Sequence, residues 1–335
     1  MSTGTPTSRP ATDSRRVLVT GGAGFIGSHL TELLLGRGDH VTVVDNLSTG
    51  RRANLPESHA GLRFIEADLG EALRAFGKVE VFDEIYHLAA AVGVKLVMSE
   101  PIRSIETNID QTSALLRFAA PTKTPTLIAS SSEVYGKSSK SPFSEDDDAV
   151  YGPTTIGRWS YACSKAIDEY LALAYHEKHG MPTVIARFFN TVGPRQVGDY
   201  GMVLPRFVGS ALRNEALRVY GDGSATRCFC DVRDVAEVLP RMLAAGACHG
   251  RVFNVGSDQP ISIASLADEV IRVTGSRSIK KFVPYAEAYP AGFEDLQQRQ
   301  PDTRRLKGAV GFSPRIALDR SIRDLAQSLS EGSDA

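Results

Sequence analysis

The sequence has 335 residues, of which 42% are hydrophobic and 23% are charged, and its formal net charge is −1 at pH 7. This length is enough for a large core and two lobes, and the near-zero charge excludes a basic field that would recruit nucleic acid or an anionic membrane. No apolar run approaches the roughly 20 residues of a membrane span, and residues 1–14 lack the apolar segment of a signal peptide. A cytoplasmic protein fits these features. The spacing of the four cysteines predicts neither a disulfide framework nor a zinc site, so no metal is expected.

The strongest motif is a short apolar run at residues 17–27 that ends in clustered glycines. A helix is predicted over residues 29–35, and a second apolar run, residues 40–44, ends at Asp45. Strand, glycine turn, helix, strand and acid together form the opening unit of a dinucleotide-binding sheet.

The three glycines and the acid of this unit have separate expected roles. Gly21 permits the tight turn, Gly24 lets the backbone approach a pyrophosphate, and Gly27 lets the helix pack closely on the strand. The exposed N–H groups at the helix start favour the negative charge of that pyrophosphate. Asp45 can accept hydrogen bonds from both adenosine ribose hydroxyls and would repel a 2′-phosphate, so the sequence predicts NAD rather than NADP.

Three further strands are predicted at residues 62–67, 84–90 and 126–130. The first ends at Asp68, which could bind the adenine amino group, and the second runs into small residues that would let a cofactor pass closely. The third ends in the polar cluster at residues 130–136. Because ligands of open α/β sheets bind beyond the carboxyl ends of the strands, these residues are candidates for the site.

Two long amphipathic helices are predicted at residues 101–119 and 161–176, on either side of a polar segment, 137–157, that is expected to form a surface loop. Tyr161 and Lys165 are four residues apart and therefore share a helix face. The predicted apolar sides carry Ile102, Ile105, Ile109, Leu115 and Leu116 on the first helix, and Ile167, Tyr170, Leu171 and Ala174 on the second. The two helices could form a four-helix interface between two copies, so a homodimer is expected.

After a strand at residues 183–188 the elements become shorter, so a second lobe is predicted to begin near Gly193. It would contain a helix at 205–214, strands at 217–220 and 227–230, and a helix from Asp234. The apolar strand at 251–255 is predicted to return to the main sheet. A helix near 265–274 and a charged loop at 287–305 are expected to end the ordered part.

From about residue 17 to about residue 326 the chain resembles the extended short-chain dehydrogenase/reductase superfamily, because the glycine motif, the serine cluster and the Tyr161–Lys165 pair occur in that order. The resemblance implies a Rossmann-type doubly wound parallel α/β sheet that binds NAD and a smaller lobe for a nucleotide sugar. We expect a disordered tail at 1–14, an NAD-binding domain at 15–192 to which 231–257 partly returns, and a sugar-binding lobe at 193–330. Ser131, Tyr161 and Lys165 would be the catalytic trio.

In this scheme Tyr161 takes the proton of the sugar 4-hydroxyl as hydride passes from C4 to NAD. Free tyrosine has a pKa of about 10, and the Lys165 ammonium and the nicotinamide charge are expected to lower it. The implied cofactor contacts are Gly21, Gly24, Phe25, Ile26, Gly27, Asp45, Asn46, Thr49, Gly50, Asp68, Leu69, Leu88, Ala89, Ala90, Asn108, Ser130, Tyr161 and Lys165.

Within the superfamily, three stretches resemble UDP-glucuronate decarboxylases: residues 132–136, residues 152–165, and residues 299–302 with Tyr289, Gly292 and Asp295 before them. This likeness implies that Ser132, Glu133 and Arg299 lie at the sugar carboxylate and serve decarboxylation and reprotonation at C5. It also implies that Asn190, Arg206, Arg218 and Arg227 hold the UDP. The loop at residues 91–95 departs from the Ser-Pro-rich loop of many decarboxylases.

Three other functions are weaker predictions. A 4,6-dehydratase needs an acid immediately before the glutamate, where this chain has Ser132. A nucleotide-sugar 4-epimerase needs neither Glu133 nor Arg299, and it remains the alternative because the 93–95 loop is epimerase-like. An NAD-sensing regulator has no use for the Tyr-Lys and Ser-Glu pairs. The favoured prediction is NAD-dependent decarboxylation of UDP-glucuronate, with the 4-keto pentose either released or reduced to UDP-xylose.

Overall fold

The structure is a computed structural model that describes residues 14–331, except for residue 78 and residues 91–99, 199–201 and 289–295. Residues 1–13 of the predicted tail, the 91–95 loop, and Tyr289, Gly292 and Asp295 therefore lie outside the described residues.

A seven-stranded parallel sheet forms the centre of the larger lobe, with the order β11-β6-β5-β4-β1-β2-β3. Its strands are β1 (Arg16–Thr20), β2 (His40–Asp45), β3 (Leu62–Glu66), β4 (Glu84–His87), β5 (Thr126–Ser131), β6 (Thr183–Phe188) and β11 (Arg251–Val255). The strand order reverses between β1 and β4, and ligands of doubly wound sheets bind at this switch point. The predicted Rossmann-type sheet is confirmed.

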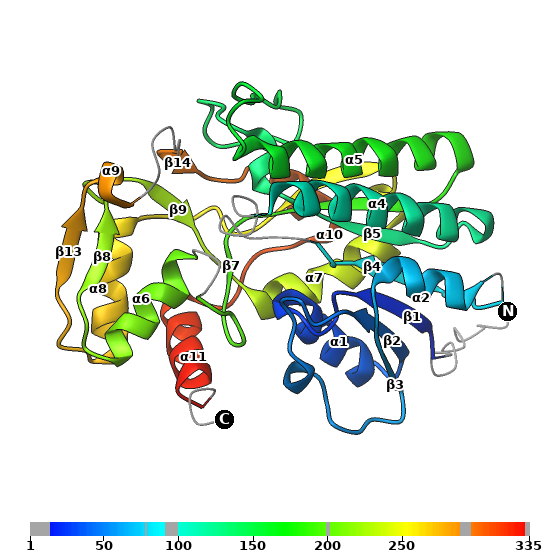
Figure 1. Cartoon of the computed structure of the whole chain (residues 1–335), viewed down its shortest axis with the longest axis horizontal. Coiled ribbons are helices and arrows are strands. Elements are labelled where there is room, and N and C mark those ends of the chain that lie inside the picture. Colours follow the sequence, from blue (N-terminus) through cyan, green and yellow to red (C-terminus); the bar gives the residue numbers. More distant parts are fainter. Residues whose placement is uncertain (1–13, 78, 91–99, 199–201, 289–295, 332–335) are drawn as a thin grey trace, which may run out of the picture.

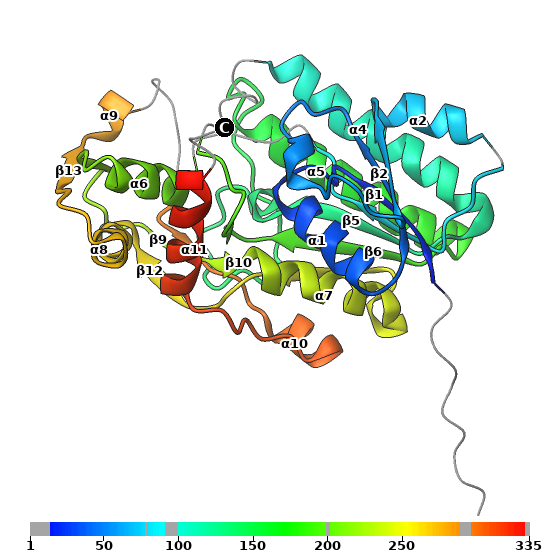
Figure 2. The same cartoon turned by 90° about the horizontal axis from the view of Figure 1, so that it is seen from below.

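Helices cover both faces of this sheet (Figure 2). On one face lie α1 (Phe25–Gly36), α7 (Val232–Ala244) and α10 (Arg304–Val310); on the other lie α2 (Leu69–Phe76), α4 (Pro101–Ala119) and α5 (Trp159–His179). Successive strand residues point to opposite faces, so Val17 and Val19 enter the core beneath α1 and α7 while Leu18 enters the core beneath α2, α4 and α5. A strand buried on both faces explains the uninterrupted apolar run before the glycines.

The smaller lobe lies beside the carboxyl ends of the strands, at the left of Figure 1. Its elements are β7 (Thr191–Val192), α6 (Val203–Leu212), β8 (Leu217–Tyr220), β9 (Thr226–Cys228), β10 (Cys230–Asp231), β12 (Pro260–Ser262), α8 (Ile263–Thr274), β13 (Lys280–Val283), α9 (Tyr285–Ala288), β14 (Gln298–Arg299) and α11 (Leu318–Glu331). Short 3₁₀ helices form at Arg52–Asn54, Ala120–Thr122, Ser132–Tyr135 and Gly246–Cys248. A core of its own joins α6, α8 and α11.

Two predictions about the smaller lobe are wrong, and one about the segment before α5 is wrong in part. The ordered part does not end with the charged loop, because Ile322 and Leu325 recur at helical spacing and bury α11 in the core of the small lobe. The strand predicted at 227–230 is two strands, β9 and β10, that pair in different sheets. The segment 137–157 is not wholly a surface loop, since Phe143 and Glu145 are buried.

Candidate active site

A cavity of about 790 Å³ lies beyond the carboxyl ends of the sheet strands and reaches from the glycine turn to Arg299. Most of the predicted site residues line it: Gly21, Gly24, Phe25, Ile26, Gly27, Asp45, Asn46, Thr49, Asp68, Leu69, Leu88, Ala89, Ala90, Ser130, Ser131, Ser132, Glu133, Tyr161, Lys165, Asn190 and Arg299. Gly50, Asn108, Arg206, Arg218 and Arg227 do not line it. Asn108 lies on the buried face of α4 and donates to the Ser164 hydroxyl, while Arg218 is exposed on β8.

The glycine turn has the tight geometry that a dinucleotide site needs. Gly21 has a φ of +71°, and a Cβ at Gly27 would lie 2.1 Å from the Gly21 carbonyl oxygen, so a side chain fits at neither position. Gly24 is the N-cap of α1, and the first N–H groups of the helix that follow it have no partner within the helix. These donors and the positive end of the helix dipole suit a pyrophosphate.

Asp45 organises the loop at the adenosine end of the cavity. Its Oδ2 accepts a hydrogen bond from the Ala23 N–H at 3.0 Å, and its Oδ1 accepts one from the Leu47 N–H at 2.8 Å. Burial raises the pKa of Asp45, and these two N–H donors oppose that shift. Each carboxylate oxygen has a further lone pair for a ribose hydroxyl. The residues present therefore fit NAD.

Tyr161 lies near the first turn of α5, with Lys165 one turn further along the same face. Burial raises the pKa of Tyr161, the Glu133 carboxylate raises it further, and the hydrogen-bonding Ser131 hydroxyl lowers it. The predicted lowering by Lys165 is not found in this arrangement. The Lys165 ammonium instead donates to Asp168 Oδ2 at 2.8 Å, and the Asp168 carboxylate raises the Tyr161 pKa.

A buried polar network lies behind this pair. Asp168 is fully buried, and burial raises its pKa while Lys165 lowers it. His87 hydrogen-bonds the Thr20 hydroxyl at 2.7 Å and the Thr112 hydroxyl at 3.1 Å. Burial and the nearby Lys165 charge lower the His87 pKa to about 3, so this imidazole is neutral at physiological pH. The sequence analysis missed Asp168, although its position three residues after Lys165 on a helix is the signal that identifies such a pair.

At the other end of the cavity three arginines surround one carboxylate. Glu133 Oε1 accepts from the Arg299 guanidinium at 2.7 Å, and Glu133 Oε2 lies 3.5 Å from Arg158. Burial pushes the Glu133 pKa up, but Arg299, Arg158 and the more distant Arg227 outweigh it and lower the pKa below its ordinary value. Arg158 lines the cavity and has no role in the sequence analysis. Arg158 is the N-cap residue of α5, three residues before Tyr161, and this position alone does not reveal its contact with Glu133.

The described residues contain no group of three or more His, Cys, Asp or Glu side chains that could hold a metal ion. Within the described ranges, no helix combines the length and apolarity needed to cross a membrane. All four cysteines, in the small lobe, on α5 and after α7, are free thiols.

Residues 17–256 match a family described as the NAD dependent epimerase/dehydratase family. The UDP-N-acetyl-alpha-D-glucosaminuronate decarboxylase of Bacillus cytotoxicus is 41% identical over 314 residues, which cover 93% of this chain and 97% of that protein. The UDP-glucuronic acid decarboxylase 1 of Danio rerio is 36% identical over 321 residues, which cover 95% of this chain and 73% of that protein. Among solved structures, the UDP-glucose 4-epimerase of Thermus thermophilus in complex with NAD has a TM-score of 0.81 and 29% identity, covering 94% of this chain and 99% of that one. The predicted superfamily is confirmed, and the chain belongs to the NAD dependent epimerase/dehydratase family.

Proposed function

We propose that this chain is an NAD-dependent decarboxylase of UDP-linked hexuronates, with UDP-glucuronate as the expected substrate and UDP-4-keto-pentose or UDP-xylose as the product. The observation that carries the proposal is the Glu133 cluster with Arg299 and Arg158 at the cavity end. Guanidinium groups bind carboxylates strongly and with defined geometry. The names of the two decarboxylase relatives point to the same reaction.

The first step is oxidation at C4, and bound NAD supplies the hydride acceptor. Tyr161 as phenolate takes the proton of the 4-hydroxyl, and the Ser131 hydroxyl holds that group in line. The raised Tyr161 pKa means that the phenolate is scarce until a positive charge is brought close to it. The Lys165–Asp168 pair fixes the ammonium one turn below the phenol, on the same helix face.

The second step is loss of the C6 carboxylate. Because C4 is now a ketone, the sugar is a β-keto acid, and such acids lose CO₂ readily. The C5–C6 bond breaks, its electron pair forms an enolate with oxygen at C4, and C6 leaves as CO₂. C5 then takes one proton, which gives the 4-keto pentose. Arg299 and Arg158 hold the departing carboxylate and stabilise the developing enolate charge.

The lowered pKa of Glu133 changes the role expected for this residue. A carboxyl group whose pKa is lowered is ionised at neutral pH and cannot donate the proton that C5 needs. We assign Glu133 to orienting the Arg299 guanidinium, with which it makes a 2.7 Å hydrogen bond. Ser132, which is buried next to it, lines the same end of the cavity and would position the carboxylate.

A 4-epimerase remains the rival, and the solved structure named above is an epimerase. Epimerisation requires oxidation, rotation of the sugar and return of hydride, and it leaves the C6 group in place. It has no use for a buried acid–arginine cluster beside the reacting sugar. That cluster therefore favours decarboxylation.

The deciding experiment is mass spectrometry of the products from UDP-glucuronate, UDP-N-acetylglucosaminuronate and UDP-glucose, each incubated with the enzyme and NAD. We expect release of CO₂ from a uronate, and neither a 6-deoxy-4-keto sugar nor UDP-galactose from UDP-glucose. Rapid interconversion of C4 epimers with the carboxylate retained would overturn the assignment and establish the epimerase.

We also propose that the enzyme is a cytoplasmic homodimer. Helices α4 and α5 pack together, and their buried faces mix polar and apolar side chains, while Ile102 and Tyr170 are 72% and 75% exposed. Exposed apolar side chains on two adjacent helices suit a four-helix contact with a second copy. Substituting Glu for Ile167 and Tyr170 should convert a dimer into a monomer in sedimentation analysis, whereas a wild-type monomer would refute the proposal.

A further inference from the structure

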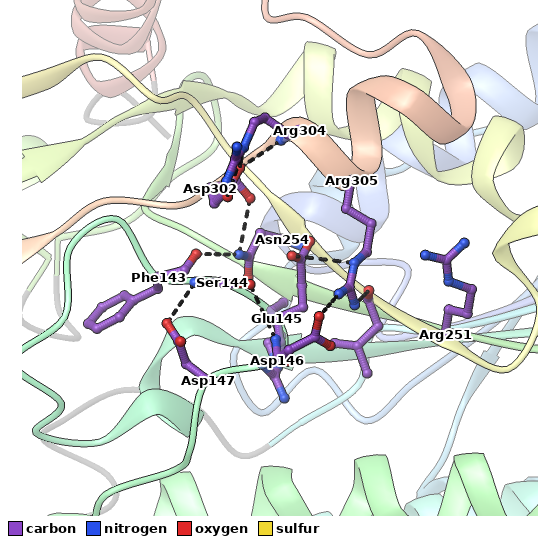
Figure 3. Close-up of polar contacts among 12 residues, drawn as sticks. Phe143, Ser144, Glu145, Asp146, Asp147, Arg251, Asn254, Asp302, Arg304 and Arg305 are labelled. Carbon is purple, nitrogen blue, oxygen red and sulfur yellow. Dashed lines mark hydrogen bonds and ion pairs between the residues drawn. The ribbon is translucent and has the colours of Figure 1, made fainter.

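Asn254 has no part in the reaction outlined above, yet it is completely buried near the end of β11 and hydrogen-bonds three other segments of the chain. Figure 3 shows its contacts with Phe143 and Asp302. Buried amides remain only where their hydrogen bonds are satisfied. The hydrogen bonds of the Asn254 side chain go to the turn that carries Glu133, to the segment 137–157, and to the residues that follow Arg299.

Its contacts are short and directional. Asn254 Oδ1 accepts from the Tyr135 hydroxyl at 2.6 Å, and Asn254 Nδ2 donates to the Phe143 carbonyl at 2.9 Å and to the Asp302 carbonyl at 3.2 Å. The backbone N–H of Asn254 donates to Glu145 Oε1 at 2.9 Å.

These contacts close a ring of which Glu133 and Arg299 are members. Tyr135 ends the 3₁₀ turn that carries Glu133, and Asp302 lies three residues after Arg299. The two ends of the ring meet in the 2.7 Å hydrogen bond between Arg299 and Glu133. Asn254 therefore ties the Glu133 segment to the Arg299 segment in addition to their direct contact.

The segment 137–157 also makes hydrogen bonds to members of this ring. The Phe143 N–H donates to the Gln300 carbonyl, and the Asp302 N–H donates to the Phe143 carbonyl, both at 2.8 Å. The Tyr135 and Phe143 rings stack at a centroid distance of 4.6 Å. Glu145 lies 3.6 Å from the Arg305 guanidinium, which also binds Asp146 (Figure 3). A change at Asn254 would thus be transmitted to the backbone on both sides of the cluster.

We propose that Asn254 is a positioning residue that sets the geometry of the Glu133–Arg299 pair and so determines how much of the C4-oxidised sugar is decarboxylated. The inference rests on the proposed function. Oxidation at C4 depends on Tyr161 and NAD, whereas the side-chain hydrogen bonds of Asn254 go to the segments of Glu133 and Arg299, so the two steps should respond differently to a change at Asn254.

The test compares Asn254→Asp and Tyr135→Phe with wild type. Asn254→Asp keeps the acceptor for Tyr135 but replaces the donor that faces the Phe143 and Asp302 carbonyls. Tyr135→Phe keeps the aromatic side chain that stacks on Phe143 and removes the hydrogen bond to Asn254. It therefore provides the test if Asn254→Asp does not fold. Arg251→Ala, on the same strand and exposed, is the matched control, because Arg251 donates to the Ala247 carbonyl instead of joining the ring.

Single-turnover reactions with the UDP-uronate that wild type decarboxylates would measure NADH formation and CO₂ release separately. We expect CO₂ released per sugar oxidised to fall roughly 10- to 100-fold in Asn254→Asp and less in Tyr135→Phe, because a small misplacement of a binding group has effects of this size. The rate of NADH formation should change less than about threefold on the same reasoning, and Arg251→Ala should match wild type. Equal losses in both steps, or an unchanged ratio, would overturn the proposal.

A second readout does not depend on turnover. The pKa of Glu133, followed by NMR of a ¹³C-labelled carboxyl and assigned with Glu133→Gln, should rise in Asn254→Asp, as we also expect in Arg299→Ala, which removes a charge that lowers this pKa. A Glu133 pKa that stays at the wild-type value in Asn254→Asp would refute the positioning role. If wild type released no CO₂ from any uronate, the proposed function would fail, and this titration would still decide the role of Asn254.

Discussion

The two ends of the cavity are built in different ways. The part of the cofactor end that suits the pyrophosphate and the adenosine ribose comes from one stretch of chain, the β1–α1–β2 unit, where backbone N–H groups such as those of Ala23 and Leu47 bind Asp45. The sugar end gathers Glu133, Arg158 and Arg299 from three separate parts of the chain, and the first and the last are 166 positions apart in the sequence. The contacts at the first end join residues that are close in the sequence and use backbone groups. The contacts at the second end join residues that are far apart in the sequence and use charged side chains.

This difference determines how each end can be altered. A parallel sheet and a helix start hold the cofactor end, so a single side chain there should change selectivity more than it changes the architecture. At the sugar end the ionised Glu133 and its arginines depend on one another, since removing one partner of a buried charged pair leaves the others uncompensated. Tyr161 lies between the two ends, and changes to it should have the largest effect.

Tyr161→Phe should abolish oxidation at C4, with a fall of about 10³-fold or more, because the ring still packs but has no acid–base group. NAD affinity measured by fluorescence titration should be unchanged. In wild type the raised Tyr161 pKa means that the reactive phenolate increases as pH rises, so the oxidation rate should climb with pH through the alkaline range. NADH formation by Tyr161→Phe at the wild-type rate would show that another group is the base.

Lys165→Ala should slow C4 oxidation by about 100-fold and move the pH–rate profile to higher pH, because the buried Asp168 carboxylate then acts on Tyr161 without its counter-ion. Asp168→Asn should shift the pH–rate profile in the opposite direction. It removes a charge that raises the Tyr161 pKa, so its profile should move to lower pH. The measurement is single-turnover NADH absorbance across a pH series, and shifts of the same sign in the two variants would contradict the arrangement.

Arg299→Ala should impair decarboxylation at the sugar end of the cavity without weakening NAD binding at the cofactor end. We expect CO₂ release to fall by roughly 100-fold, the lower end of the effect of removing one electrostatic donor near developing charge, with NAD affinity within about twofold of wild type. Glu133→Gln should act in the same direction with a smaller effect, because the amide can still accept from Arg299. Equal losses of NAD binding and CO₂ release would mean that the variants act through folding, which thermal melting would reveal.

The same contrast explains what could be predicted from the sequence. The sheet, the glycine turn and the Tyr161–Lys165 spacing were readable because each depends on residues close together in the chain. Beyond Gly193 the signals were weaker: α11 was missed although Ile322 and Leu325 have helical spacing, and β9 and β10 were merged because one residue separates them.

The contacts that shape the sugar end could not be predicted in this way. Nothing local to Arg158 indicates that it will meet Glu133, and nothing local to Asn254 indicates that it will bind Tyr135 and Asp302. These contacts depend on how the 3₁₀ turn, the 137–157 segment and β14 come together in the folded chain. The Lys165–Asp168 ion pair could have been predicted, because the two residues are three apart on a helix. The sequence does not show that both side chains are buried, which is what makes the pair important for the charge near Tyr161.

The smallest expected effect is at the cofactor end. Asp45→Ala should narrow the preference for NAD over NADP by roughly tenfold, because a negative charge beside the ribose repels a 2′-phosphate. The variant also removes the acceptor for the Ala23 and Leu47 N–H groups, so both cofactors should bind more weakly. That loss affects NAD and NADP alike, whereas charge repulsion affects only NADP, so the ratio of the two dissociation constants isolates the charge. Titration of both cofactors against wild type and Asp45→Ala measures it. An unchanged ratio, or equal affinity for the two cofactors in wild type, would show that Asp45 orders the loop without selecting the cofactor.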